Sequence, residues 1–390
     1  MLPRVKINYL NGLLGTVPEN KDGLLGLVVL GATAVSSTFA LGKPYYIIRP
    51  DDLTALGINA TNNARIVALV NQFYAEAEEG TPFYLIGISG TSMTTVLDVD
   101  SGSMKAILQE LRGELRGLIV ASAATATVTV TDGLDPDVLT AMPKAQALAA
   151  WSADNLYAGL FVILEGRHFE SAADAPDLTA LAYNRVSVFI GDVAASSINA
   201  AVGTLAGRIA ISPVQRNIGR VASGALAPDK MYIGASLVEP SMSVVDTLYG
   251  KGYICPRAYV GLPGCYIVDD PMAVATTDDY AHLTARRTVD KAARIAYVTM
   301  LQFLLDEIEV NEDGTMQQPI LKSWQATVED AINQQMTAAG ELSAVNGSGC
   351  RFYIDPSQNV LGTSKVTGTL KVRPFGYARD IIVNIGFLTA

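Results

Sequence analysis

The chain has 390 residues, of which 49% are apolar and only 17% charged, a composition typical of about two or three globular domains with little solvated surface. Its formal net charge is −10, and no short window is dominated by lysine and arginine. These features argue against a nucleic-acid partner, which requires a basic face, and against a polybasic membrane anchor.

The first residues alternate apolar Val5, Ile7 and Tyr9 with polar side chains, which predicts a half-buried strand. No basic region leads into an apolar run here, so no signal peptide is expected. Residues 23–42 carry no charge and are long enough to span a membrane, but four glycines dilute their hydrophobicity. A buried strand at residues 24–30 is the preferred interpretation, and no membrane insertion is expected.

Strands and helices then alternate along the chain. Residues 45–49 and 82–88 are strand-like, and the apolar residues of 62–79 recur at steps of three and four, as in an amphipathic helix. The same alternation continues with predicted helices at 103–111, 136–151 and 194–205 and predicted strands at 118–120, 127–130, 160–164 and 185–190. This rhythm predicts an α/β layer with some parallel pairing, forming a central inserted domain.

The C-terminal third has a different character. Residues 249–271 are rich in glycine, proline and tyrosine, which predicts strands joined by tight turns. Residues 285–308 and 319–340 have the apolar periodicity of two long helices, the second of which opens on a proline and closes on a glycine. Residues 350–356 and 365–373 are then strand-like, and Val366, Leu370 and Val372 share one face of the second run.

The last run, residues 380–388, is apolar on both faces. Ile381, Val383, Ile385 and Phe387 line one face, and Ile382 and Leu388 lie on the other. Such a strand requires cover on both sides. Seven residues connect it to the preceding strand, more than a tight hairpin needs, so we favour a strand delivered to a neighbouring subunit. A closing hairpin between residues 365–373 and 380–388 is the alternative.

No catalytic signature is complete. Residues 87–89 begin like a nucleophile elbow, but G-x-S-x-G requires glycine where this chain has Thr91. Neither His168 nor His282 has a context that marks it as a base for Ser89, and no phosphate-binding glycine motif is present. We therefore expect no catalytic residue and no cofactor, with an α/β hydrolase-like or ligand-binding enzyme having a site near Ser89 as the alternative.

Two acidic pairs and one basic pair are candidate binding sites. Asp269-Asp270 and Asp278-Asp279 are adjacent, whereas hard-cation loops alternate their ligands, so we expect solvated loop acids and no metal site. Arg286 and Arg287 open a predicted helix, where cations oppose the helix dipole. Either an acidic partner surface holds them, or the helix begins later.

The three cysteines, Cys255, Cys265 and Cys350, show no C-x-x-C spacing. An odd number without that spacing argues against a disulfide framework and against a zinc ribbon. We expect ordinary buried or half-buried thiols, which suit a reducing cytosol.

The order of these elements resembles that of contractile tail sheath proteins of bacteriophages and related injection particles. The resemblance rests first on "DGLLGLVVLGAT", "IRPDDLTALGI" and "FYAEAEEGTPFYLIGI". In the C-terminal part it rests on "DDYAHLTARRTVDKAARIAYVTMLQFLLDEIEV", on "PILKSWQATVEDAINQQMTAAGEL" and on the β-rich end. It implies an N-terminal arm at 1–20, sheath core at 21–90, a central α/β domain at 91–275, a C-terminal two-helix and small-sheet domain at 276–375, and a C-terminal arm at 376–390.

The resemblance also implies a function. Such a subunit forms a helical homopolymer of stacked, hexameric rings around a tail tube protein, meets baseplate and terminator proteins, and contracts without bond chemistry. The arms around Val5 to Tyr9 and Ile381 to Leu388 would complete small sheets in neighbouring subunits, and Arg286 and Arg287 would contact the tube or a neighbouring subunit. The particle would be assembled in the host bacterial cytoplasm and would form a virion tail or its equivalent. A baseplate component with the same fold is a further alternative.

Overall fold

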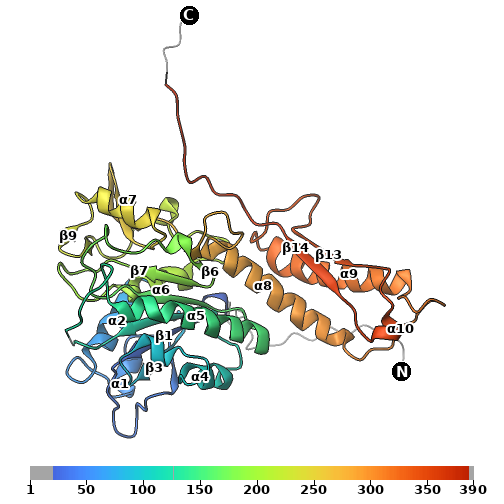
Figure 1. Ribbon diagram of the computed structural model, residues 1–390, viewed down its shortest axis with the longest axis horizontal. Helices are drawn as coiled ribbons and strands as arrows, with labels where there is room; N and C mark the ends of the chain where they lie inside the picture. The colour runs from blue at the N-terminus through green and yellow to red at the C-terminus, as the bar shows by residue number, and fades with distance from the viewer. Residues whose placement is uncertain (1–20, 126, 386–390) are drawn as a thin grey trace, which may run out of the picture.

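The computed structural model describes residues 21–125 and 127–385. Within them the chain forms a large α/β lobe (residues 21–282), a narrower small lobe (residues 283–373) and an extended C-terminal segment that leaves between the two lobes (Figure 1). The strand predicted around Val5, Ile7 and Tyr9 lies outside the described residues, as do Phe387 and Leu388.

A six-stranded sheet forms the centre of the large lobe, in the order β2-β3-β1-β4-β5-β7. Only the edge strand β2 is antiparallel, and the other neighbours pair in parallel. Every residue of β1, β4, β5 and β7 is buried, so both faces of the sheet are covered, as parallel sheets require. The strands are β1 (Leu25–Leu30), β2 (Pro44–Ile47), β3 (Phe83–Ile88), β4 (Gly117–Ser122), β5 (Phe161–Glu165) and β7 (Val186–Phe189).

Helices cover this sheet. In α6, Gly203 and Gly207 permit very close packing against α2, since a Cβ on Gly203 would lie 2.3 Å from the carbonyl oxygen of Leu69. α5 packs on β5 and β7 and also contacts α3. The helices of this lobe are α1 (Asp52–Ala55), α2 (Ala64–Glu76), α3 (Met93–Val96), α4 (Met104–Glu110), α5 (Pro136–Asn155), α6 (Val202–Ile211) and α7 (Met242–Gly250), with short 3-10 turns η1 (Lys21–Gly23), η2 (Leu178–Ala180) and η3 (Val221–Ser223).

The predicted α/β layer with parallel pairing is confirmed, but its parts are distributed differently. One half of the sheet, β2-β3-β1, comes from residues 21–90 and the other half, β4-β5-β7, from residues 91–275, and both halves share one core, so within the described residues position 90 does not separate two domains. The strand predicted at 127–130 is irregular, because β4 before it is already paired on both sides. The helix predicted from residue 194 begins only at Val202.

Short antiparallel pairs complete the large lobe. They are β6 (Ala182–Tyr183) with β12 (Ala273–Val274), β8 (Tyr232–Ile233) with β9 (Ser236–Leu237), and β10 (Pro256–Tyr259) with β11 (Leu262–Ile267). The last pair confirms the strands and tight turns predicted at 249–271. Among the described residues, no helix combines the length and apolarity that a membrane crossing requires.

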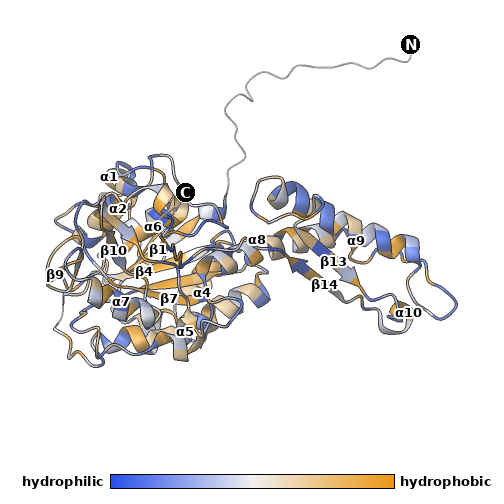
Figure 2. Cartoon of the chain, turned by 90° about the horizontal axis from the view of Figure 1, so that it is seen from above, coloured by the Kyte–Doolittle hydropathy of each residue, from blue (hydrophilic) through white to orange (hydrophobic). Residues whose placement is uncertain are grey.

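The small lobe is built on two helices and a hairpin, and Figure 2 shows it projecting from the large lobe along α8. Strand β13 pairs antiparallel with β14, and one face of this hairpin packs on the helices. The helix predicted at 285–308 ends at Met300 and is followed by a single 3-10 turn; Leu304 is extended and Leu305 has a φ of 64°, so no helix continues to residue 308. The elements are α8 (Leu283–Met300), η4 (Leu301–Phe303), α9 (Gln318–Ile332), the π-helical turn η5 (Asn333–Thr337), β13 (Cys350–Ile354), α10 (Val360–Thr363) and β14 (Gly368–Val372).

A buried ion-pair cluster joins the two lobes at α8. Asp290 on α8 accepts two hydrogen bonds from Arg185 of the large lobe, at 2.9 and 3.2 Å, and one from Arg286 at 2.8 Å. Asp290 is only 5% exposed, and Gly159 lies so close to it that a side chain there would collide with its carboxylate. The first half of α8 is therefore part of the large lobe's interior, and its second half carries the small lobe.

Candidate assembly site

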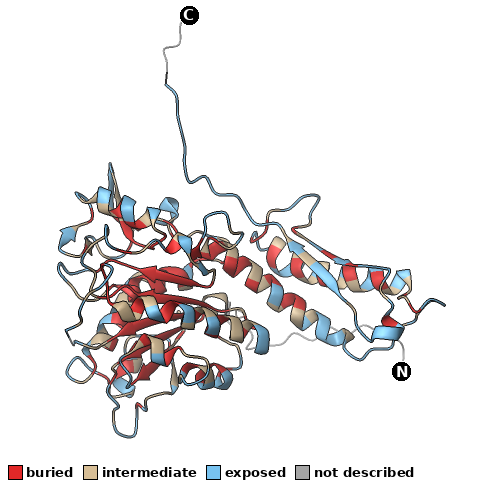
Figure 3. Ribbon diagram, in the orientation of Figure 1, coloured by how far each residue is buried: buried red, intermediate tan, exposed pale blue. Residues whose placement is uncertain are grey.

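The chain leaves the small lobe as an extended, apolar tail, residues 380–385. Ile381, Ile382, Val383 and Ile385 are between 72% and 93% exposed, and Figure 3 shows this segment exposed along its described length. No part of the described tail is in a strand, so the closing hairpin with residues 365–373 does not form there, and β14 pairs with β13 instead. Several large apolar side chains in sequence without cover are typical of an interaction segment.

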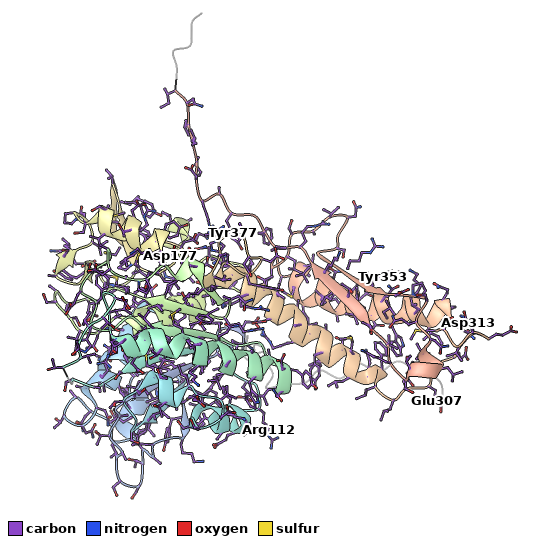
Figure 4. The ribbon with its side chains drawn as sticks, in the orientation of Figure 1. Arg112, Asp177, Glu307, Asp313, Tyr353 and Tyr377 are labelled. Carbon is purple, nitrogen blue, oxygen red and sulfur yellow. The ribbon has the colours of Figure 1, made fainter. Side chains whose placement is uncertain are left out.

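The root of the tail is fastened to the large lobe by a strap, residues 374–379. The Tyr377 hydroxyl donates a hydrogen bond to the Gln215 carbonyl oxygen. Arg379 Nε donates to Asp269 Oδ2 at 2.6 Å, and the Arg379 guanidinium also lies over the Tyr377 ring at 5.4 Å. Figure 4 shows Tyr377 where the chain passes the large lobe before it turns away. The strap therefore sets the point from which the tail departs.

The strap is held by a buried carboxylate pair, which corrects the prediction of solvated loop acids at this position. Asp269 and Asp270 are 4% and 0% exposed. Asn217 Nδ2 donates to both, at 2.5 and 2.8 Å, and Tyr249 donates to Asp269 at 3.1 Å. These partners come from distant segments, so the sequence pattern did not reveal them. Asp278 and Asp279, by contrast, are half-buried and exposed loop residues, as predicted.

Asp270 also caps α8. Its Oδ2 accepts from the backbone nitrogen and the hydroxyl of Thr284, both at 2.7 Å, which places a carboxylate at the positive end of the helix. Burial raises the pKa of Asp270. Burial alone would also raise the pKa of Asp269, but its hydrogen bonds with Arg379 and Asp270 and the nearby charges of His282 and Arg379 together outweigh burial and hold that pKa below its usual range. The pair thus shares one site, in which Asp269 carries the charge that Arg379 neutralises.

His282 completes a group that is close enough to hold a metal ion. Its Nδ1 lies 3.2 Å from Asp270 Oδ1, and one ligand atom from each of Asp269, Asp270 and His282 falls within 4.8 Å of the others. The same carboxylate oxygens already accept hydrogen bonds from Arg379, Asn217 and Thr284, so a cation would have to displace these donors. These side chains are therefore better suited to holding Arg379 of the strap than to binding a metal ion.

The small lobe presents an open strand edge. Arg373 N donates to Gly349 O at 2.8 Å, and bonded pairs alternate along antiparallel strands, so the backbone groups of Leu370 and Val372 point away from β13. Consistently, Phe352 N, opposite Leu370, donates to Glu329 Oε1 at 2.7 Å instead of to β14. Within the described residues no strand pairs with the outer edge of β14. That edge can accept one more strand.

An apolar groove of about 510 Å³ lies beside this hairpin. Trp324 stacks on Phe303 at its side, with ring centroids 4.5 Å apart. Leu304 and Leu305, which also line the groove, are 69% and 97% exposed. The small lobe therefore offers both an open edge and apolar surface next to it.

Arg286 and Arg287 are not surface residues, which corrects both interpretations of this pair. The helix begins before them, at Leu283, and the two side chains are 7% and 4% exposed. Arg286 bonds Asp290 and stacks on Tyr280, with its Cζ 4.0 Å from the ring centroid. Arg287 Nη2 donates to the carbonyl oxygens of Ile209 and Ser212, which caps the C-terminal end of α6.

The residues considered for catalysis are not brought together. Ser89 is exposed in the turn after β3, and among the described residues no hydrogen bond joins it to either histidine. His282 lies on the Asp269–Asp270 pair, and His168 follows β5, where burial lowers its pKa. The residues that sequence analysis missed are Tyr377 and Arg379, which it treated only as part of a connecting segment. The available signal was an aromatic residue two positions before an arginine, directly ahead of the apolar run.

Two family profiles together match nearly the whole chain. The DUF2586 N-terminal domain matches residues 2–271, and the DUF2586 C-terminal domain matches residues 279–390. The chain belongs to the DUF2586 family. No curated protein sequence matches it. The two matched segments are separated by residues 272–278, which contain β12 and lie just before α8, where the large lobe passes into the small one.

Solved structures show the fold of this DUF2586 protein to be that of contractile sheath proteins. A sheath chain of an extracellular contractile injection system, PVC, in the contracted state has a TM-score of 0.65 at 15% identity, over 99% of this chain and 97% of that one. A chain of the anti-feeding prophage baseplate has a TM-score of 0.64 at 16% identity, over 100% of this chain and 99% of that one. A sheath tail protein from Desulfitobacterium hafniense has a TM-score of 0.51 at 12% identity, over 95% of this chain and 100% of that one. The predicted resemblance is confirmed for the fold.

Proposed function

We propose that this DUF2586 protein is the structural subunit of a contractile sheath, which polymerises as stacked, hexameric rings around an inner tube and contracts to drive that tube through a target envelope. The observation that carries the proposal is the exposed apolar tail, Ile381 to Ile385, projecting from an anchored root. The sheath fold supports it. Besides further copies, its partners would be the tail tube, baseplate and terminator proteins of a particle assembled in a bacterial cytoplasm.

The tail and the β14 edge complement each other chemically. An extended segment laid along β14 satisfies the outward backbone groups of Leu370 and Val372, and its alternate side chains reach the apolar groove. Burial of each isoleucine or valine of the tail stabilises the contact by about 1.5–3 kcal/mol. The occupant would be the tail of a second copy, so that the contact joins two different surfaces of two subunits, as a ring or a helical polymer requires.

The test removes residues 380–390. We expect a folded protein with an unchanged unfolding curve, because the described part of the tail packs against nothing in its own subunit, and no tubes in negative-stain electron microscopy. Ile382→Asp should have the same effect as the deletion. Asn384→Asp is the matched control, since it adds the same charge to the same segment without removing apolar surface. Normal tubes from the deletion would rule out the proposed role of the tail.

A baseplate component is the second candidate, favoured by the similarity to a chain of the anti-feeding prophage baseplate. A baseplate subunit would be present in few copies and would not form long tubes alone. The copy number of the protein in purified particles, measured by quantitative mass spectrometry against the tube protein, separates the two functions.

We further propose that the protein is not an enzyme. Ser89 is exposed, His282 lies on the Asp269–Asp270 pair, His168 follows β5, and among the described residues no hydrogen bond joins Ser89 to either histidine. A serine-directed fluorophosphonate probe should leave Ser89 unlabelled under conditions in which a serine hydrolase reacts fully. Stoichiometric labelling of Ser89 would revive the α/β hydrolase-like alternative.

A further inference from the structure

A groove of about 700 Å³ lies against the large lobe, and residues 375–379 of the strap form part of its lining. Arg216 and Arg220 line it from the loop after α6, Arg257 and Tyr259 from β10, and Phe375 from the strap itself. We call this surface, defined by Arg216, Arg220, Arg257, Tyr259 and Phe375, the arginine groove.

The arginines of this groove lack carboxylate partners. Among the described residues, no ion pair includes Arg216, Arg220 or Arg257, whereas the nearby Arg379 is paired with Asp269. Arg257 stacks on Tyr259, its Cζ 4.0 Å from the ring centroid, and its buried Nε has no hydrogen-bond acceptor. A positively charged groove in a chain of net charge −10 fits a ligand bearing several carboxylates, because the guanidinium fork matches carboxylate geometry.

The same chain carries such a ligand at the far end of the small lobe. Residues 304–313, Leu-Leu-Asp-Glu-Ile-Glu-Val-Asn-Glu-Asp, contain five acidic residues and no basic one, and we call them the acidic tip. All five acidic residues are exposed, as are Leu304 and Leu305. In the described part of the chain no lysine or arginine forms an ion pair with them: Asp306 and Asp313 accept hydrogen bonds from neighbouring residues of the tip or just beyond it.

One copy cannot bring these two surfaces together. Figure 4 shows Glu307 and Asp313 at the end of the small lobe that is farthest from the large lobe, while Tyr377, which lines the groove, lies beside the large lobe. The α8 joint around Asp290 holds the lobes in this arrangement. The acidic tip can therefore reach an arginine groove only on another molecule.

We propose that the arginine groove of one copy binds the acidic tip of a second copy. The proposal rests on the proposed function in requiring copies of this chain to pack against one another. The contact joins two different surfaces and therefore generates a ring or a helical polymer and not a two-fold dimer. Leu304 and Leu305 would cover the exposed apolar side chains at the groove, Val221 and Phe375, and the carboxylates would meet Arg216, Arg220 and Arg257. Charge complementarity of this kind fixes which surfaces meet.

The first test measures binding without assembly. A fluorescent peptide of residues 304–313 is titrated with the full-length protein at a concentration below that of polymerisation, and fluorescence anisotropy is recorded. We expect binding that weakens with added salt and is at least about tenfold weaker for Arg216→Glu/Arg220→Glu. The control is Arg112→Glu, an exposed arginine on a different part of the large lobe (Figure 4). A peptide with Asn and Gln in place of Asp and Glu that binds equally well would overturn the proposal.

The second test exchanges the charges in the polymer. Arg216→Glu/Arg220→Glu and Glu307→Arg/Glu309→Arg should each reduce tube formation, and the chain carrying all four substitutions should recover it, because the reversed surfaces again attract. Normal tubes from either double variant would overturn the proposal while leaving the sheath function standing. Peptide binding without any effect on tubes would assign the groove to another acidic protein, which contradicts a second copy as its occupant.

Discussion

The two lobes of this protein differ in how far each completes its own structure. The large lobe buries its strands on both faces and uses its buried charges internally, as Arg287 does on the end of α6. The small lobe covers one face of a two-stranded hairpin, leaves the outer edge of β14 unpaired within the described residues, and releases an exposed apolar tail. The large lobe thus covers its own sheet, whereas the small lobe leaves a strand edge and an apolar segment uncovered among the described residues.

The largest effect on stability is expected where the lobes join. Asp290→Ala leaves the guanidinium groups of Arg185 and Arg286 buried without their carboxylate, which should lower the free energy of unfolding by about 3–5 kcal/mol. Urea denaturation followed by circular dichroism measures it. Asp279→Ala, on an exposed loop acid, should change it by less than about 0.5 kcal/mol. Equal effects of the two substitutions would show that the joint is not buried in solution.

A matched pair of isoleucines separates folding from assembly. Ile332→Ala, at a fully buried position of α9, should cost about 2–5 kcal/mol, whereas Ile382→Ala in the tail should leave unfolding unchanged. The two tryptophans lie in different lobes, Trp151 in α5 and Trp324 in α9, so variants retaining one of them report each lobe separately. The Ile332→Ala transition should shift more strongly when Trp324 is the reporter. Equal destabilisation by Ile382→Ala would place the tail within its own subunit's fold.

Arg379→Ala should release the strap with little loss of global stability. Spin labels at Asn384 and at exposed Thr276, in a Cys350→Ser background, should give a broader distance distribution by pulsed electron paramagnetic resonance than in the parent chain. Arg373→Ala is the control, because the contacts of Arg373 run through its backbone. If the distance distribution of the parent chain were as broad as that of Arg379→Ala, the ion pair would not anchor the tail.

The anchor should also depend on pH. The pKa of Asp269 is lowered in the folded chain, so its contribution is fully present above the unfolded pKa of about 4 and is lost as the pH falls through the folded pKa. Asp270 has the opposite effect on stability. Its pKa is raised, so protonating it at low pH removes the free-energy cost of a buried charge. His282, Tyr249 and Arg379 face the same pair. The spin-label distribution should therefore stay narrow from pH 7 to about 4 and broaden below that.

The smallest effect concerns the thiols. Burial raises the pKa of Cys255 in the large lobe to about 12 and that of half-buried Cys350 in β13 to about 11. An aromatic disulfide reagent at pH 8 should therefore react first with Cys350, and with Cys255 only after unfolding. Cys350→Ser should remove the fast phase. A fast phase that persists in this variant would contradict the difference in burial between the two lobes.

Local signals predicted most of the fold. β1 at Leu25–Leu30 and α5 at Pro136–Asn155 lie where their sequence patterns placed them, because an uninterrupted apolar run and a helix with proline in its first turn depend only on neighbouring residues. The candidate site was predicted less well. The tail's apolar pattern was recognised, but Asp269, Asp270 and Arg287 were misjudged, since each is buried by partners more than ten positions away along the chain.

The sequence by itself determined the class of the elements, their order and the apolar character of the chain's end, because these follow from side-chain periodicity and composition. Only the tertiary structure decided that residues on both sides of position 90 share one sheet, that β14 pairs with β13, and that Arg379 fastens the tail to the large lobe. Strand partners and burial of charge depend on which distant segments meet in space. The residues next to a given position in the sequence carry little information about which distant segments it will contact.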